Sequence, residues 1–174
     1  MEAAETQSLL IITGSMGSGK TAVLAEASDI LALHGIPHAA IDLDMLGMAR
    51  LPAAAENSDV MYRNLKTVWG NYVDYGIDRL LLARAVENRA EFERCLAAVG
   101  AKEVVGCRVM ASIETMEQRV GLRELGTCRG KYIERVKTLN AALDQARLEN
   151  FSITNEDRSL TEIAKEVLQR ARWL

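Results

Sequence analysis

Residues 14–21 read Gly14-Ser15-Met16-Gly17-Ser18-Gly19-Lys20-Thr21 and fit the pattern GxxxxGK[ST] at every fixed position. An apolar run, SLLIIT, precedes them at 8–13, and apolar residues at helical spacing follow them at 21–34. A strand, a glycine-rich turn and a helix in this order form the context in which the pattern binds phosphate. The segment therefore predicts a parallel α/β sheet with the strand 8–13 at its centre.

The octapeptide contains the residue types that a polyphosphate site needs. Its glycines allow backbone turns in which successive N–H groups point at phosphate oxygens. Lys20 supplies a positive charge for the β- and γ-phosphates, Thr21 a hydroxyl for Mg²⁺, and the helix N-terminus a partial positive charge. We expect every residue of the octapeptide to contact a nucleotide: Gly14, Ser15, Met16, Gly17, Ser18, Gly19, Lys20 and Thr21. An accidental match in a glycine-rich turn is the alternative, which the flanking strand and helix disfavour.

The rest of the chain alternates short apolar runs with longer amphipathic stretches, as a parallel sheet with crossover helices requires. Further strands are predicted at 38–43, 79–86, 103–110 and 151–154. Further helices are predicted from a cap at 57–59 to Gly76, at 90–99, from Ser112 toward Leu125, at 131–149, and after a capping box at 159–162. Two glycines within 126–130 indicate a mobile loop and a lid over roughly 119–135. We expect one domain over 1–174, with a five-stranded parallel sheet and helices on both faces.

Two aspartates, Asp42 and Asp44, end the second predicted strand. Residues i and i+2 of a strand share a face, so both side chains are expected in the crevice at the carboxyl edge of the sheet. We assign Asp42 with Thr21 to Mg²⁺, and Asp44 to a substrate hydroxyl as general base, with the reverse assignment left open. A solvated pair of loop carboxylates is the alternative.

Arginines gather around the predicted lid, and a guanidinium on a closing loop can stabilise the charge of a transferring phosphoryl group. They are Arg119, Arg123, Arg129 and Arg135. We select Arg119 and Arg123 as catalytic candidates together with Lys20. Neighbouring glutamates leave open an ordinary exposed helix surface.

Two further residues are candidates for substrate contact. Arg84 lies near the end of the third predicted strand, where ligands of α/β sheets bind. Tyr72 lies on the helix before it and is expected in the core or in the wall of the substrate pocket.

The bulk composition narrows the class of partner and compartment. A net charge of −3, a pI near 5.5 and 5% aromatic residues give no basis for nucleic-acid binding or for attraction to an anionic membrane. Three cysteines without a CxxC pair indicate free thiols and a reducing compartment. The acidic start of the sequence lacks the basic region of a signal peptide, and the apolar run after it is too short to span a bilayer. We therefore expect a cytoplasmic protein.

The segments GSMGSGKT at 14–21 and GIPHAAIDLD at 35–44 resemble the adenylylsulfate kinase, gluconate kinase and shikimate kinase group of P-loop kinases. The stretch 64–72 resembles uncharacterised bacterial P-loop ATP-binding proteins. Asn155 and the segment 160–164 resemble the adenine-side region of these kinases, which implies that Asn155 contacts the nucleotide. The resemblance implies ATP and Mg²⁺ as ligands, a lid, and phosphate transfer to a hydroxyl.

Together these features predict an ATP-dependent phosphotransferase, as a monomer or homodimer, that moves the γ-phosphate to a small-molecule acceptor. The runner-up is an ATP-binding regulatory or scaffold protein with little transfer activity. It is favoured by the third predicted strand, RLLLARAV, which ends without the usual metal-binding aspartate.

Overall fold

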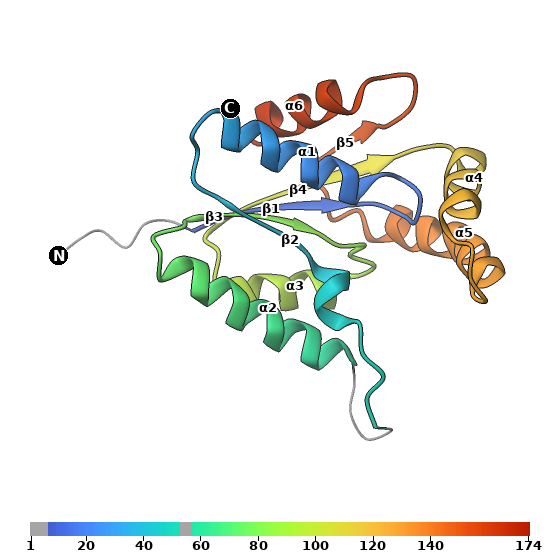
Figure 1. Cartoon of the computed structure of the whole chain (residues 1–174), viewed down its shortest axis with the longest axis horizontal. Helices are drawn as coiled ribbons and strands as arrows, with labels where there is room; N and C mark the ends of the chain where they lie inside the picture. Colours follow the sequence, from blue (N-terminus) through green and yellow to red (C-terminus); the bar gives the residue numbers. More distant parts are fainter. Residues whose placement is uncertain (1–6, 53–56) are drawn as a thin grey trace.

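A five-stranded parallel sheet forms the centre of the protein in the computed structural model, which describes residues 7–52 and 57–174 (Figure 1). The strands are β1 (Ser8–Thr13), β2 (Ala39–Asp42), β3 (Arg79–Ala83), β4 (Glu103–Met110) and β5 (Phe151–Thr154). They lie in the order β2-β3-β1-β4-β5, and all neighbours are parallel. The predicted central position of 8–13 is confirmed, because β1 has two strands on each side.

In the part of the chain that the structure describes, six helices pack around the sheet, and a 3₁₀ helix, η1 (Leu43–Gly47), follows β2. They are α1 (Lys20–Leu33), α2 (Asn57–Val73), α3 (Arg89–Val99), α4 (Ile113–Arg123), α5 (Arg129–Ala146) and α6 (Leu160–Arg170). α1 and α6 cover one face of the sheet, α2 and α3 cover the other, and α4 and α5 stand side by side beyond the ends toward which the strands point (Figure 1). The predicted α/β class with helices on both faces is therefore confirmed.

The side-chain alternation of β1 explains why both faces are covered. Leu10 and Ile12 are buried against α1 and α6, whereas Leu9 and Ile11 are buried against α2 and α3. All four side chains are at most 2% exposed, so neither face of this strand can be left to solvent. A continuous apolar run is the expected sequence of such a strand.

Two predicted strands are too long, and the difference matters for the site. β2 ends at Asp42, whose carboxylate accepts a hydrogen bond from the Asp44 N–H at 3.1 Å and begins η1. Asp44 consequently lies on a 3₁₀ turn, so the expectation that both aspartates share a strand face is wrong. β3 ends at Ala83, which places Arg84 in the loop after the strand.

The helix starts follow the capping residues that the sequence offers. Ser112 accepts a hydrogen bond from the Thr115 N–H, and the predicted capping box between Ser159 and Glu162 is present. The predicted cap of α2 includes the side chain of Asn57, which lies outside the described part of the structure. Across residues 7–52 and 57–174, no helix has the length and apolar character needed to cross a membrane.

All three cysteines carry free thiols, as expected. Burial raises the pKa of Cys95 to about 11 and that of Cys107 to about 12. Cys128 is exposed at the N-cap of α5.

Candidate functional site

The glycine-rich loop between β1 and α1 has the backbone shape that only glycine allows at two positions. Gly17 and Gly19 have φ values of 78° and 95°. A Cβ on Gly17 would lie 2.4 Å from the Met116 carbonyl oxygen, and one on Gly19 would lie 2.1 Å from Asn155 Nδ2. The loop therefore packs directly against α4 and the segment after β5, with no space for side chains there.

Side chains from distant parts of the chain hold this loop from outside. Asn155 Nδ2 donates to the Ser18 carbonyl oxygen at 2.7 Å. Arg119 donates to the carbonyl oxygens of Gly17 at 3.3 Å and Asn155 at 2.9 Å. Ser15, which is 1% exposed, donates from Oγ to the Val136 carbonyl oxygen at 2.9 Å. The loop is thus shaped by its contacts with α4, α5 and the segment after β5.

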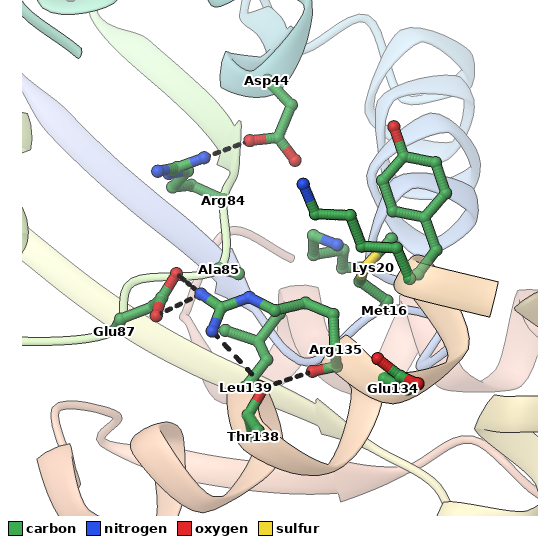
Figure 2. Close-up of a pocket in the computed structure, with 12 residues that line it drawn as sticks. Met16, Lys20, Asp44, Arg84, Ala85, Glu87, Glu134, Arg135, Thr138 and Leu139 are labelled. Carbon is green, nitrogen blue, oxygen red and sulfur yellow. Dashed lines mark hydrogen bonds and ion pairs between the residues drawn. The ribbon is translucent and has the colours of Figure 1, made fainter. Parts of the chain in front are cut away.

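Lys20 begins α1 and extends toward Asp44 (Figure 2). Burial lowers the pKa of its ammonium below the ordinary 10.5, and the carboxylates of Asp44 and Asp42 oppose that change. A positive charge held in a poorly solvated position needs anionic partners. The site therefore combines a partly desolvated lysine with two nearby carboxylates, whose charges favour its protonated form.

Thr21 and Asp42 offer the oxygen ligands that Mg²⁺ prefers. Thr21 Oγ1 donates a hydrogen bond to Asp42 Oδ2 at 2.8 Å, which joins the first turn of α1 to the end of β2. Mg²⁺ in phosphate sites is typically bound by a hydroxyl, one or two carboxylates, water and the phosphates themselves. The donor chemistry of this pair fits the ion, even though the described residues include no cluster of three or more acidic, histidine or cysteine side chains for a metal.

Asp44 forms an ion pair with Arg84, which also donates to Glu91 Oε1 at 3.1 Å. Burial lowers the pKa of Arg84, but the carboxylates of Asp44 and Glu91 outweigh burial and raise it above its ordinary value. Glu91 Oε2 in turn accepts from the Glu87 N–H at 2.9 Å. Asp44 is thus oriented by a charged chain that runs from η1 through the loop after β3 to α3.

A cavity of about 500 Å³ opens between Lys20, Asp44 and α5 (Figure 2). Met16 and Leu139 give it an apolar wall, and Tyr132 of α5 also lines it. Glu87 and Arg135 form an ion pair at 2.6 Å between the loop after β3 and α5. The cavity therefore borders both the phosphate loop and the Asp44 carboxylate, and its size suits a small molecule.

A buried arginine secures α5, the helix that supplies much of this cavity. Arg108 of β4 is 3% exposed and donates to Asn140 Oδ1 at 3.0 Å. It also pairs with Asp144 at 2.8 Å and with Glu149 at 3.7 Å. The contacts with Asn140 and Asp144 attach the second half of α5 to the sheet, while Leu139 and Leu143 pack with Ala85.

The structure brings most predicted site residues together. Lys20, Asp42, Asp44 and Arg84 meet at one place with Thr21. The charge of Arg123 acts on Lys20 from the end of α4, while its Nε donates to Glu124 at 2.8 Å. Arg119 and Asn155 lie against the backbone of the phosphate loop.

Tyr72 is separated from this group. It lies near the end of α2, where its carbonyl oxygen accepts from the N–H of Ile77, two residues before β3 begins. Its place is therefore at the amino edge of the sheet, opposite the phosphate loop, and it does not line the cavity. The direction of a crossover helix could have indicated this, because the chain must return to the start of the next strand.

Sequence reasoning did not select several residues of the cavity wall. Glu87, Lys131, Tyr132, Thr138 and Leu139 were not candidates, although all line the cavity. The sequence indicates Arg135 only as one of the arginines near the predicted lid. A polar residue just after a strand was a usable signal for Glu87. The face that α5 turns toward the loop depends on tertiary packing.

No protein-family profile matches the sequence, and no curated protein matches it either. Solved structures are similar over nearly the whole chain. The APS kinase of Mycobacterium tuberculosis, in complex with AMPPNP and APS, has a TM-score of 0.63 and 20% identity, covering 94% of this chain and 96% of that one. The shikimate kinase of Acinetobacter baumannii, in complex with shikimate, has a TM-score of 0.62 and 16% identity, covering 97% and 95%. A gluconokinase of Sinorhizobium meliloti has a TM-score of 0.61 and 14% identity, covering 98% and 94%. The chain has the fold of small P-loop kinases.

Proposed function

We propose that this protein is an ATP-dependent phosphotransferase that moves the γ-phosphate of ATP to a hydroxyl group of a small molecule. The observation that carries the proposal is the position of Lys20 and Asp44 between the phosphate loop and the 500 Å³ cavity. The structures that share the fold support it, because they are named as kinases of small molecules: APS kinase, shikimate kinase and gluconokinase. Its free thiols and weak net charge favour a cytoplasmic protein without a nucleic-acid partner.

Each group of the site has a task in such a transfer. The loop amides and the Lys20 ammonium hold the phosphates and neutralise the charge that develops on them. An acceptor hydroxyl in the cavity attacks the γ-phosphorus, the bond to the β,γ-bridging oxygen breaks, and ADP leaves. Asp44, oriented by Arg84, takes the proton of the hydroxyl. Arg123 lies close enough to Lys20 to add positive charge on the lid side.

Mg²⁺ fits beside the loop on the oxygens of Thr21 and Asp42. When bound, it neutralises charge on the β- and γ-phosphates. This assignment separates the two aspartates, since Asp42 faces the Thr21 hydroxyl while Asp44 faces Arg84 and the cavity.

The second candidate is an ATP-binding regulatory protein with little transfer activity. The observation that favours it is the ion pair between Asp44 and Arg84, which occupies the proposed base. In that case the site would bind ATP tightly and transfer its phosphate to no acceptor.

The two candidates are separated by ADP formation with a panel of small hydroxylated metabolites, combined with calorimetry of ATP binding. For the kinase, we expect turnover with one acceptor, loss of ATP binding in Lys20→Ala, and a fall in kcat of about 10²–10⁴-fold in Asp44→Asn. ATP affinity should change little in Asp44→Asn. The matched control is Asp74→Asn, beyond the far end of α2, which should retain full activity. Tight ATP binding without an acceptor would favour the regulatory protein.

A further inference from the structure

The amino edge of the sheet contains a second cavity, of about 430 Å³, that the phosphate site does not use. Three neighbouring strands begin here in register, with Ser8 of β1 beside both Arg79 of β3 and Glu103 of β4. Register partners of a parallel sheet point to the same face. Leu10, two residues after Ser8, packs against α1 and α6, so these three side chains lie on that same face.

The chain end after α6 completes the cavity from that face. Arg172 and Trp173 line it, and α6 ends at the edge of the sheet opposite α4 and α5 (Figure 1). Arg172 has a φ of 60°, a left-handed conformation that costs free energy in a residue with a side chain. The turn is closed by Trp173 N–H, which donates to the Leu168 carbonyl oxygen at 2.9 Å. A glycine would form this turn without strain, yet the chain has an arginine there.

The charges of the cavity are only partly compensated. Within residues 7–52 and 57–174, neither Arg79 nor Arg172 has a carboxylate at ion-pair distance. The one carboxylate side chain in the wall, Glu103, accepts a hydrogen bond from Ser8 Oγ at 3.1 Å. Two guanidinium groups on one cavity suit an anion, which they can bind through paired hydrogen bonds.

The indole of Trp173 adds an apolar surface beside the arginines. It is partly buried, packs against the core under α1 and α6, and lines the cavity together with Val105. An aromatic wall favours a ligand with a flat ring, because contact with the indole removes one face of the ligand ring from water. A ring and an anionic group in one ligand would use both features of the cavity.

From these contacts we propose that the amino edge of the sheet is a second ligand site, which binds a small aromatic organic anion. Arg79 and Arg172 hold the anionic group, and Trp173 contacts the ring. The site is independent of the phosphate loop, because it lies at the opposite edge of the sheet and shares none of its residues. This proposal and the proposed kinase activity can therefore be tested independently of each other.

Phenyl phosphate is a suitable probe, and Trp173 fluorescence is the readout. We expect saturable quenching in the native protein and no saturable change in Trp173→Phe, because Trp69 is 2% exposed in the core. Inorganic phosphate should bind at least tenfold more weakly, because it lacks a ring. Equal affinities for the two probes, or no saturation by phenyl phosphate, would overturn the proposal.

Substitutions separate ligand binding from structural effects. Arg79→Gln and Arg172→Gly should each weaken phenyl phosphate binding at least tenfold, and Lys165→Gln, an exposed control on α6, by less than twofold. Arg172→Gly also removes the left-handed strain, so its melting temperature should stay the same or rise. Weaker binding without a lower melting temperature cannot result from unfolding. Unchanged affinity in either arginine variant, or an equal loss in Lys165→Gln, would contradict the site.

Discussion

The carboxyl and amino edges of the sheet differ in how closely their glycines with positive φ are packed. At the carboxyl edge, the phosphate loop needs glycine at Gly17 and Gly19, and burial lowers the pKa of the Lys20 ammonium. At the amino edge, Gly76 also has a positive φ of 81°, but within residues 7–52 and 57–174 no atom beyond the glycine and its two chain neighbours lies within 4 Å of the place where its Cβ would be. The same backbone conformation is therefore a close packing requirement at one edge and an ordinary turn at the other. Substitutions at the two edges should differ accordingly.

The largest expected effect is that of Lys20→Met on nucleotide binding. Loss of the ammonium should weaken ATP binding by at least about 100-fold, or about 2.8 kcal/mol. Calorimetry with ATP and Mg²⁺ measures this directly. The control is Lys165→Met on α6, and equal ATP affinity in the two variants would contradict the role of Lys20.

The same Lys20→Met variant should remove a pH dependence of stability. The pKa of Lys20 is lowered in the folded protein, so the unfolded chain binds more protons between that lowered value and 10.5. The free energy of unfolding of the native protein should thus increase as the pH rises through this window. The variant should not show this increase. Denaturant unfolding at several alkaline pH values tests the difference.

A smaller effect is expected from Arg108→Ala, which removes the ionic attachment of α5. The free energy of unfolding should fall by about 2–3 kcal/mol, since a buried hydrogen-bonded charge is lost and a cavity remains. Lys137→Ala provides the comparison, because Lys137 is exposed and its surface ion pair with Glu117 contributes at most about 1 kcal/mol. Urea denaturation measures both losses. Equal losses would mean that the contacts of Arg108 contribute no more to the free energy of unfolding than a surface ion pair.

Gly19→Ala and Gly76→Ala compare the two edges most directly. Each forces alanine into a left-handed conformation, which should cost about 1–2 kcal/mol of stability. Only Gly19→Ala also displaces Asn155 Nδ2, so only this variant should lose about tenfold in ATP affinity. Similar ATP affinities for the two variants would show that the loop adapts to a side chain.

The smallest change is expected for Ser8→Ala at the amino edge. It removes the hydrogen bond from Ser8 Oγ to Glu103, which is exposed to solvent. The free energy of unfolding should change by less than about 0.5 kcal/mol, with ATP affinity unaltered. A loss of ATP affinity would mean that the two edges are coupled through β1.

The fold could be predicted because its signals are local. The apolar run of β1, the glycine pattern after it and the capping box at Ser159 each follow from neighbouring residues. The boundaries of β2 and β3 were less accurate, because the side chain of Asp42 caps a 3₁₀ turn that propensity alone does not reveal. Asp44 lies near Lys20, as the sequence predicts, but it lies on a 3₁₀ turn and not on a strand.

The site was predicted where it follows a strand and missed where it depends on packing. Asp42 ends β2 and Arg84 comes directly after β3, so their place at the carboxyl edge follows from sheet topology. The contribution of α5 could not be derived in this way. Which residues it turns toward the cavity depends on contacts such as those of Arg108 with Asn140, between residues 32 positions apart.

The positions of the three cysteines allow one of them to be labelled selectively. Cys128 is the exposed cysteine, at the start of α5, whereas Cys95 and Cys107 are buried and ionise only at high pH. A maleimide dye at neutral pH should thus attach at Cys128 alone, without any engineered cysteine. Its emission would report, in the native chain, whether the hairpin of α4 and α5 moves when ATP arrives.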